Sequence, residues 1–133
     1  MAKKEVISVP KLAPALGPFT RAIRVGDLLF ISGTSALSHL PGDLNSRPLP
    51  AGIVAQTRQT LDNIGAVLEA SGVTFNDIVK VTVMLKNTSD YKEMNAVRAE
   101  YFKDAATTSS TFICDLIRDD MLVEIEAIAT AKP

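Results

Sequence analysis

The order of hydrophobic and polar positions divides the chain into strands and helices. The segment from Ala22 to Ser32, AIRVGDLLFIS, has two short runs of β-forming residues on either side of Gly26-Asp27, a pair typical of a tight turn. This pattern predicts a β-hairpin. The next segment, up to about Gly52, is rich in proline, glycine, serine and asparagine and has no periodicity, so we expect a surface loop. Loops of this length often carry function.

Two stretches with helical periodicity follow the loop. From Ile53 onward, apolar positions recur at spacings of three and four, which predicts an amphipathic helix with Gly72 as its left-handed C-terminal cap. A second helical face begins after Asp90. Glu93 lies three residues later, the spacing of a capping box, and we expect this helix to end near Lys103.

Strand periodicity marks three further segments. Apolar and polar residues alternate in IVKVTVMLK after the first helix, and STFICDLI and LVEIEAIAT follow the second helix, separated by a charged turn. The element order is therefore β-β-α-β-α-β-β. This order predicts an α+β fold in which one mixed sheet carries both helices on one face, and 133 residues suit a single domain, 1–133.

Such a fold leaves the second face of the sheet uncovered. Because 47% of the residues are hydrophobic, we expect apolar side chains on that face. Self-association into a closed ring would bury them. Functional sites would then lie between subunits.

Charge, cysteine content and hydrophobic run length limit which partners the protein can have. The net charge is −1 with mixed signs along the chain, which argues against a nucleic-acid partner. The single cysteine, Cys114, and the single histidine, His39, supply no ligand set for structural zinc and no internal disulfide. The start MAKKEVISVP lacks the apolar core of a signal peptide, and no run approaches the ~18 apolar residues of a membrane span. We expect a cytoplasmic protein with no membrane partner.

Five segments together resemble one protein family. They are APALGPFTRAIRVGDLLFISG, GIVAQTRQTLDNIGAVLEASG, DIVKVTVMLKN, MNAVRAEYF and LVEIEAIA, in this order from about Ala13 to Ala129. They resemble the reactive intermediate/imine deaminases, the RidA/YjgF proteins. The resemblance implies a chorismate-mutase-like α+β fold, a homotrimer and a small-molecule site in each cleft between subunits. It also implies hydrolysis of an enamine or imine to a 2-oxo acid and ammonia, with neither a cofactor nor a metal.

The resemblance assigns roles to particular residues. The serine-glycine pair of the family site falls on Ser32-Gly33, its asparagine on Asn95 and its water-steering glutamate on Glu124. Two positions depart from the family pattern. Phe19 stands where the family has a tyrosine, and Ser109 stands where the family has the arginine that grips the substrate carboxylate.

The change at Ser109 has a physical cost. A guanidinium binds a carboxylate through two charge-assisted hydrogen bonds, whereas a serine offers one neutral donor. Loss of a paired partner for a buried charge costs about 2 to 5 kcal/mol. Two explanations are open. Another cation replaces the arginine, with Arg21 the preferred candidate and Arg118 and His39 the others, or the protein is a non-catalytic ligand-binding or regulatory trimer.

The segment SGTSA, from Ser32 onward, also resembles the 2-aminomuconate deaminases of this family. In such a site Glu124 would move protons, while Ser32 and Thr34 would hold a carboxylate or a developing oxyanion. The segment TTSSTF, from Thr107 to Phe112, is rich in hydroxyl groups, but the sequence shows no neighbouring base that would activate one of them as a nucleophile. We instead expect Ser109 and Thr111 to share a strand face and line the substrate cleft.

Overall fold

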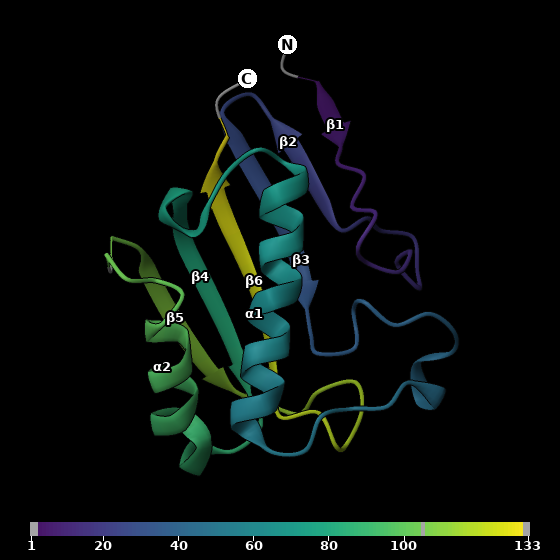
Figure 1. The fold of residues 1–133 in the computed structure, drawn as a ribbon, viewed down its shortest axis with the longest axis vertical. Helices are drawn as coiled ribbons and strands as arrows, with labels where there is room; N and C mark the ends of the chain where they lie inside the picture. Colours follow the sequence, from purple (N-terminus) through teal and green to yellow (C-terminus); the bar gives the residue numbers. More distant parts are fainter. Residues whose placement is uncertain (1–2, 105, 132–133) are drawn as a thin grey trace.

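The computed structural model describes residues 3–104 and 106–131. One mixed sheet of six strands, in the order β1-β2-β3-β6-β4-β5, forms the centre of the molecule (Figure 1). The strands are β1 (Lys4–Val6), β2 (Ala22–Val25), β3 (Leu28–Thr34), β4 (Ile78–Leu85), β5 (Thr108–Ile113) and β6 (Val123–Thr130). The helices are α1 (Ile53–Ala70) and α2 (Tyr91–Ala99), with short 3-10 turns at Leu44–Ser46, Phe75–Asp77 and Thr88–Asp90.

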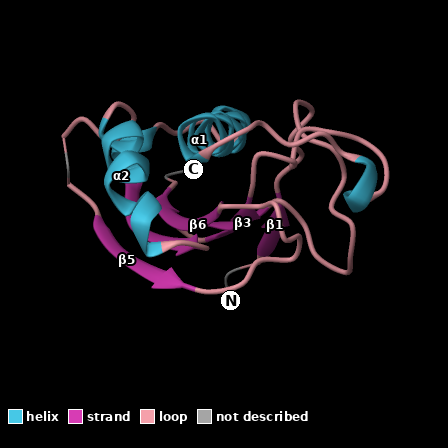
Figure 2. Ribbon diagram, turned by 90° about the horizontal axis from the view of Figure 1, so that it is seen from below, coloured by secondary structure: helices cyan, strands magenta, loops and turns pink. Residues whose placement is uncertain are grey.

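Both helices lie on the same side of the sheet, as the hydrophobic pattern predicts (Figure 2). The predicted hairpin is confirmed: β2 and β3 pair antiparallel, and Gly26 between them has a φ of 57°. Gly72 after α1 has a φ of 74°, the left-handed conformation expected of a helix cap. None of the helices in the described residues is long and apolar enough to cross a membrane.

Three predicted details are wrong. The second helix ends at Ala99, four residues before Lys103. Its capping box does not form, because the Asp90 side chain makes no cap hydrogen bond; its carboxylate accepts one from Asn87 instead. The strand expected to reach residue 117 ends at Ile113, because its parallel partner β4 ends at Leu85 and offers no further ladder positions.

The two faces of the sheet differ in cover. Alternate residues of the central strands, such as Val81, Val83 and Ile125, are at most 1% exposed and form the core beneath α1 and α2. The other face presents apolar side chains to solvent: Leu28 is 40% exposed and Phe30 is 43% exposed. The single chain therefore carries the uncovered apolar face that the sequence predicts.

The long loop between β3 and α1 is held in place by a buried arginine. Arg47 is 5% exposed, and its guanidinium donates hydrogen bonds to the carbonyls of Gly42 (3.0 Å) and Leu37 (3.2 Å). Arg118, from the connection between β5 and β6, donates to the carbonyls of Leu44 and Arg47, each at 2.7 Å. These bonds fix the loop against the ends of β3 and β6.

Candidate functional site

A cavity of about 630 Å³ lies between the long loop and the ends of β3 and β6; we call it the loop-side cavity. Its polar lining includes Arg21, Gly33, Arg47 and Glu124, and Phe19 forms part of its apolar wall. The structure thus brings together four of the residues that the sequence predicts for the site, namely Phe19, Arg21, Gly33 and Glu124.

Glu124 approaches the backbone of Gly33 closely. It lies on β6 between the buried Val123 and Ile125, so its side chain points to the uncovered face of the sheet. The pairing of β3 with β6 shifts its register between Ile31 and Thr34, and Gly33 lies within this irregular stretch. A Cβ atom at Gly33 would overlap Glu124 Oε2. Glycine at this position therefore makes room for the carboxylate.

The environment of Glu124 favours its protonated form. Burial, and then the nearby charge of Glu126, raises the pKa of the Glu124 carboxyl above its ordinary value. Among the described residues, Glu124 forms no salt bridge. A half-buried carboxyl group with a raised pKa at the wall of a cavity can accept and return a proton.

Arg21 contributes positive charge to the same cavity. Its guanidinium donates hydrogen bonds to three main-chain carbonyls, those of Ala13 (2.9 Å), Ser38 (3.2 Å) and Pro14 (3.5 Å). Burial, and then the charge of Arg47, lowers the pKa of Arg21. Within the described part of the chain, neither arginine forms a salt bridge with a carboxylate. The lining of the loop-side cavity thus contains two guanidinium groups, of Arg21 and Arg47, and two carboxyl groups, of Glu124 and Asp43.

Ser32 and Thr34 do not line this cavity. The Ser32 hydroxyl donates to the carbonyl of Thr20 at 2.5 Å, and Ser32 lines a separate hollow on the uncovered sheet face. Thr34 is 1% exposed, and its hydroxyl donates to the carbonyl of Ser32 at 2.8 Å. Of the segment SGTSA, only Gly33 and Ser35 line the loop-side cavity.

A second cavity, of about 230 Å³, lies between α2 and β5; we call it the helix-side cavity. Its polar lining consists of Asn95, Arg98, Thr107 and Ser109, and its apolar lining of Val81, Ala99 and Phe102. The structure brings together Asn95 and Ser109, two residues that the sequence predicts for the site. Thr111 does not line this cavity, although it shares a strand face with Ser109.

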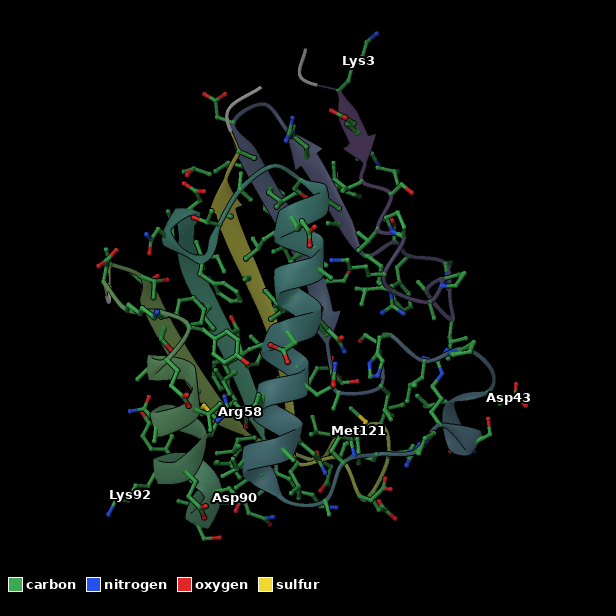
Figure 3. The ribbon with its side chains drawn as sticks, viewed as in Figure 1. Lys3, Asp43, Arg58, Asp90, Lys92 and Met121 are labelled. Carbon is green, nitrogen blue, oxygen red and sulfur yellow. The ribbon has the colours of Figure 1, made fainter. Side chains whose placement is uncertain are left out.

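The two cavities lie on opposite faces of one sheet. Ser109 is aligned with the core residue Val81, so its side chain is on the face that the helices cover, whereas Glu124 points to the uncovered face. Figure 3 shows Asp43 on the long loop at one side of the molecule and Lys92 on α2 at the other. No residue lines both cavities. The predicted site residues therefore form two separate groups within one chain.

The other candidate residues are bound elsewhere. Arg118 forms a salt bridge with Asp120 (2.6 Å) in addition to its two bonds to loop carbonyls. His39 Nδ1 lies 3.2 Å from Asn63 Nδ2, and burial, followed by the charge of Arg47, lowers the pKa of His39. Neither residue lines either cavity.

Among the charged residues that line the cavities, sequence reasoning missed Asp43, Arg47 and Arg98. Arg98 could have been found, because it stands three residues after Asn95, and residues at this spacing share a face of a helix. Arg47 gave no such signal, since it lies in an aperiodic loop. In the described part of the chain, no three histidine, cysteine, aspartate or glutamate side chains are grouped as a metal site would need.

Comparison with known proteins identifies the family of this fold and site. The Endoribonuclease L-PSP family profile matches residues 10–131. A RutC family protein of Pyrococcus horikoshii is 40% identical over 126 residues, covering 95% of this chain and 97% of the relative. The mouse (Mus musculus) 2-iminobutanoate/2-iminopropanoate deaminase is 34% identical over 130 residues, covering 98% and 93%.

The solved structures agree with the sequence comparison. The crystal structure of the YjgF gene product from E. coli superposes with a TM-score of 0.82 at 30% sequence identity, covering 96% of this chain and 99% of the other. The chain therefore belongs to the RidA/YjgF family, the proteins that the Endoribonuclease L-PSP profile describes. Membership confirms the resemblance and the fold class, and it assigns a deaminase function in general terms.

Proposed function

We propose that the protein is a cofactor-independent deaminase that hydrolyses an enamine or imine metabolite to a 2-oxo acid and ammonia. The observation that carries this proposal is Glu124, a half-buried carboxyl group with a raised pKa at the wall of a cavity that also holds two guanidinium groups. The family membership supports the same reaction class, since the mouse relative is a 2-iminobutanoate/2-iminopropanoate deaminase.

The proposed chemistry requires one proton-transfer group. Ionised Glu124 accepts a proton from water as the water oxygen bonds to C2 of the imine and the C=N bond becomes a C–N bond. The protonated Glu124 then returns the proton to the nitrogen. The same carboxylate then carries the remaining hydroxyl proton to the nitrogen as the C–N bond breaks, so that C2 becomes the carbonyl of the 2-oxo acid and NH3 leaves. An enamine substrate first moves a proton from nitrogen to carbon, which the same carboxyl group can assist.

Two substrate classes fit the loop-side cavity differently. A 2-imino acid such as 2-iminobutanoate, named for the mouse relative, carries one carboxylate. 2-Aminomuconate carries two carboxylates at the ends of a conjugated chain. Arg21 and Arg47 both line the cavity, so two guanidinium groups are present for the two carboxylates of the dicarboxylate. We therefore propose 2-aminomuconate deamination as the particular activity, with Arg21 as the anchor for one of the two substrate carboxylates.

The assembly that we propose is a homotrimer with sites between subunits. The uncovered apolar face of the sheet supports association, and the separation of the two cavities within one chain supports a site completed by a second copy. With a net charge of −1, the chain has little to attract a nucleic acid, so we do not propose that it cleaves RNA. We expect it to act in the cytoplasm on small carboxylates.

Ammonia release from freshly generated substrates tests the proposal. Activity on 2-aminomuconate alone supports the particular activity, and activity on 2-iminobutanoate alone contradicts it while keeping the deaminase class. Activity on neither favours the alternative, a non-catalytic ligand-binding or regulatory trimer. Glu124→Gln should reduce turnover on the order of 10²- to 10⁴-fold. Turnover that persists in this variant would contradict the role of Glu124.

An Arg21→Ala variant tests this anchor. The expected result is a higher KM, because a substrate carboxylate loses a charged partner in the loop-side cavity. An unchanged KM would exclude Arg21 as the anchor. Because Arg21 also binds three loop carbonyls, the measurement needs a thermal unfolding curve that separates loss of binding from loss of folding.

A further inference from the structure

The helix-side cavity contains a guanidinium that has no charged partner. Arg98 Nη1 donates a hydrogen bond to Ser109 Oγ at 2.7 Å, and Arg98 Nε donates to Asn95 Oδ1 at 2.8 Å. Both acceptors are neutral. None of the salt bridges in the described part of the chain includes Arg98. The positive charge at this cavity is therefore available to a ligand.

The geometry around Arg98 fits a small carboxylate. A guanidinium has five N–H donors, of which these two bonds use two, so donors remain for the fork of a carboxylate. Asn95 and Ser109 hold the guanidinium in place, which reduces the entropy lost when a ligand binds. The Ser109 hydroxyl and the Asn95 amide N–H are further donors at the same wall.

The remaining walls indicate the rest of the ligand. Val81, Ala99 and Phe102 give the cavity apolar lining in addition to its polar groups. A volume of about 230 Å³ is below the range of sites for drug-sized ligands, which begins near 300 Å³. One carboxylate with a short stretch of chain beside it, as at one end of a 2-imino acid or of 2-aminomuconate, matches this combination of one charge and a small apolar surface.

We propose that Arg98, positioned by Asn95 and Ser109, binds the substrate carboxylate in the helix-side cavity. The guanidinium absent at residue 109 is thus supplied by α2, from a residue whose side chain contacts Ser109. This inference deepens the proposed function and rests on it for the identity of the substrate. It also names a different residue from Arg21, whose guanidinium already binds three main-chain carbonyls.

A relocation of the charge tests the inference. Arg98→Ala should weaken binding of 2-oxobutanoate, a stable carboxylate probe, about 10- to 150-fold, the usual loss for a hydrogen bond to a charged group. The double variant Arg98→Ala/Ser109→Arg returns a guanidinium to the same cavity and should recover most of the affinity. The affinity of Arg98→Lys for 2-oxobutanoate should lie between those of wild type and Arg98→Ala, because lysine keeps the positive charge but lacks the planar fork of donors.

A matched control and a second readout separate binding from folding. Arg58→Ala removes an exposed arginine of α1 that pairs with Glu100 outside both cavities, and it should leave the affinity unchanged. In deaminase assays, Arg98→Ala should raise KM by the same factor with little change in kcat. Isothermal titration with 2-oxobutanoate supplies the affinities, and the unfolding temperature shows whether each variant is folded.

The outcomes are distinct. If wild type binds 2-oxobutanoate through Arg98 but hydrolyses no imine, the inference stands and the proposed function fails. If wild type is an active deaminase and the folded Arg98→Ala variant keeps its KM and affinity, the inference is overturned and the proposed function stands. Absence of 2-oxobutanoate binding to wild type also overturns the inference. It is overturned too if the Arg98→Ala/Ser109→Arg variant binds 2-oxobutanoate no more tightly than Arg98→Ala does.

Discussion

Glu124 shows how the position of one residue determines its chemistry. It and Glu126 point to the same face of β6, but only Glu124 lines the loop-side cavity and contacts the backbone of Gly33. Burial and the neighbouring charge make its ionised form costly. A carboxyl group held in this way is a better proton carrier at neutral pH than an exposed one.

The raised pKa of Glu124 predicts a pH-dependent effect on stability. Its folded-state pKa lies above the unfolded value, so protonation favours folding, and stability falls as the pH rises through the raised pKa. Glu124→Gln removes this penalty. We expect the variant to melt above wild type at pH 7, with the difference vanishing once the pH falls below the ordinary pKa of a glutamate.

Thermal unfolding followed by circular dichroism across this pH range is the measurement. A Glu124→Gln variant that melts below wild type at pH 7 would contradict the prediction. The same pKa predicts that kcat of wild type falls as the solution is acidified through it, because only ionised Glu124 accepts a proton from water.

Gly33 supports a second prediction at this scale. An added methyl group would overlap Glu124 Oε2, so Gly33→Ala must displace the carboxylate or the strand. We expect a loss of about 1 to 3 kcal/mol in the free energy of unfolding and at least a tenfold loss of kcat. Urea unfolding and steady-state kinetics measure the two effects. Gly65→Ala on α1 is the control, since its nearest neighbour, Phe75, lies at an ordinary contact distance of 3.5 Å; a similar kcat loss there would contradict the argument.

At the scale of elements, Gln56 joins the start of α1 to the connection that leads into β6. Its side-chain amide donates to the carbonyls of Pro50 and Asp120, each at 3.1 Å, and accepts from the Leu122 N–H at 2.8 Å. Gln56 is 3% exposed. One side chain therefore satisfies three backbone groups that would otherwise lack partners.

Removal of this side chain should destabilise the fold. Gln56→Ala leaves three partly buried backbone groups without their partner, and we expect a loss of about 2 to 4 kcal/mol. Gln59→Ala, three residues later, removes only one hydrogen bond, to Asn63, and should cost about 1 kcal/mol or less. Equilibrium unfolding in urea compares the two variants, and equal losses would refute the assignment.

The elements also show which parts of the fold the sequence can predict and which parts depend on contacts between distant residues. Periodicity predicts α1, the β2–β3 hairpin and the strands of the sheet, because alternation and helical spacing report which face is buried. It does not predict where β5 ends, since that depends on the length of β4, its partner in space. Residue types at particular spacings identified Glu124, Gly33 and Asn95 through the family resemblance. Arg47 was beyond reach, because its burial depends on how an aperiodic loop folds.

At the scale of the whole molecule, the uncovered sheet face predicts association. Phe30 lies on this face and is 43% exposed in the single chain. A charge there would be buried without a partner in any assembly that covers the face. We expect wild type to have three times the chain mass of 14.3 kDa, as the proposed homotrimer would, and Phe30→Asp to yield monomers. Light scattering coupled to gel filtration measures the mass.

Val54→Asp is the matched control for this variant. Val54 is 39% exposed on α1, away from the uncovered face of the sheet, so the same new charge should not change the mass. A wild-type protein that is monomeric at micromolar concentration, or a Phe30→Asp variant that keeps the wild-type mass, would show that this face does not mediate association.

Glu124 and Arg98 line cavities on opposite faces of the sheet, so the site that we propose takes one residue from each of two copies. Glu124→Gln and Arg98→Ala are each expected to be poorly active at low substrate concentration. Trimers assembled randomly from both variants contain intact pairs at about a quarter of their sites.

The measurement is the initial rate of ammonia release by the co-expressed variants, with freshly generated imine well below the wild-type KM. The account predicts that the mixture regains about a quarter of the wild-type rate, while each variant alone stays far below it. A mixture no more active than the two variants measured separately, beside an active wild type, would contradict a site built from Glu124 of one copy and Arg98 of another.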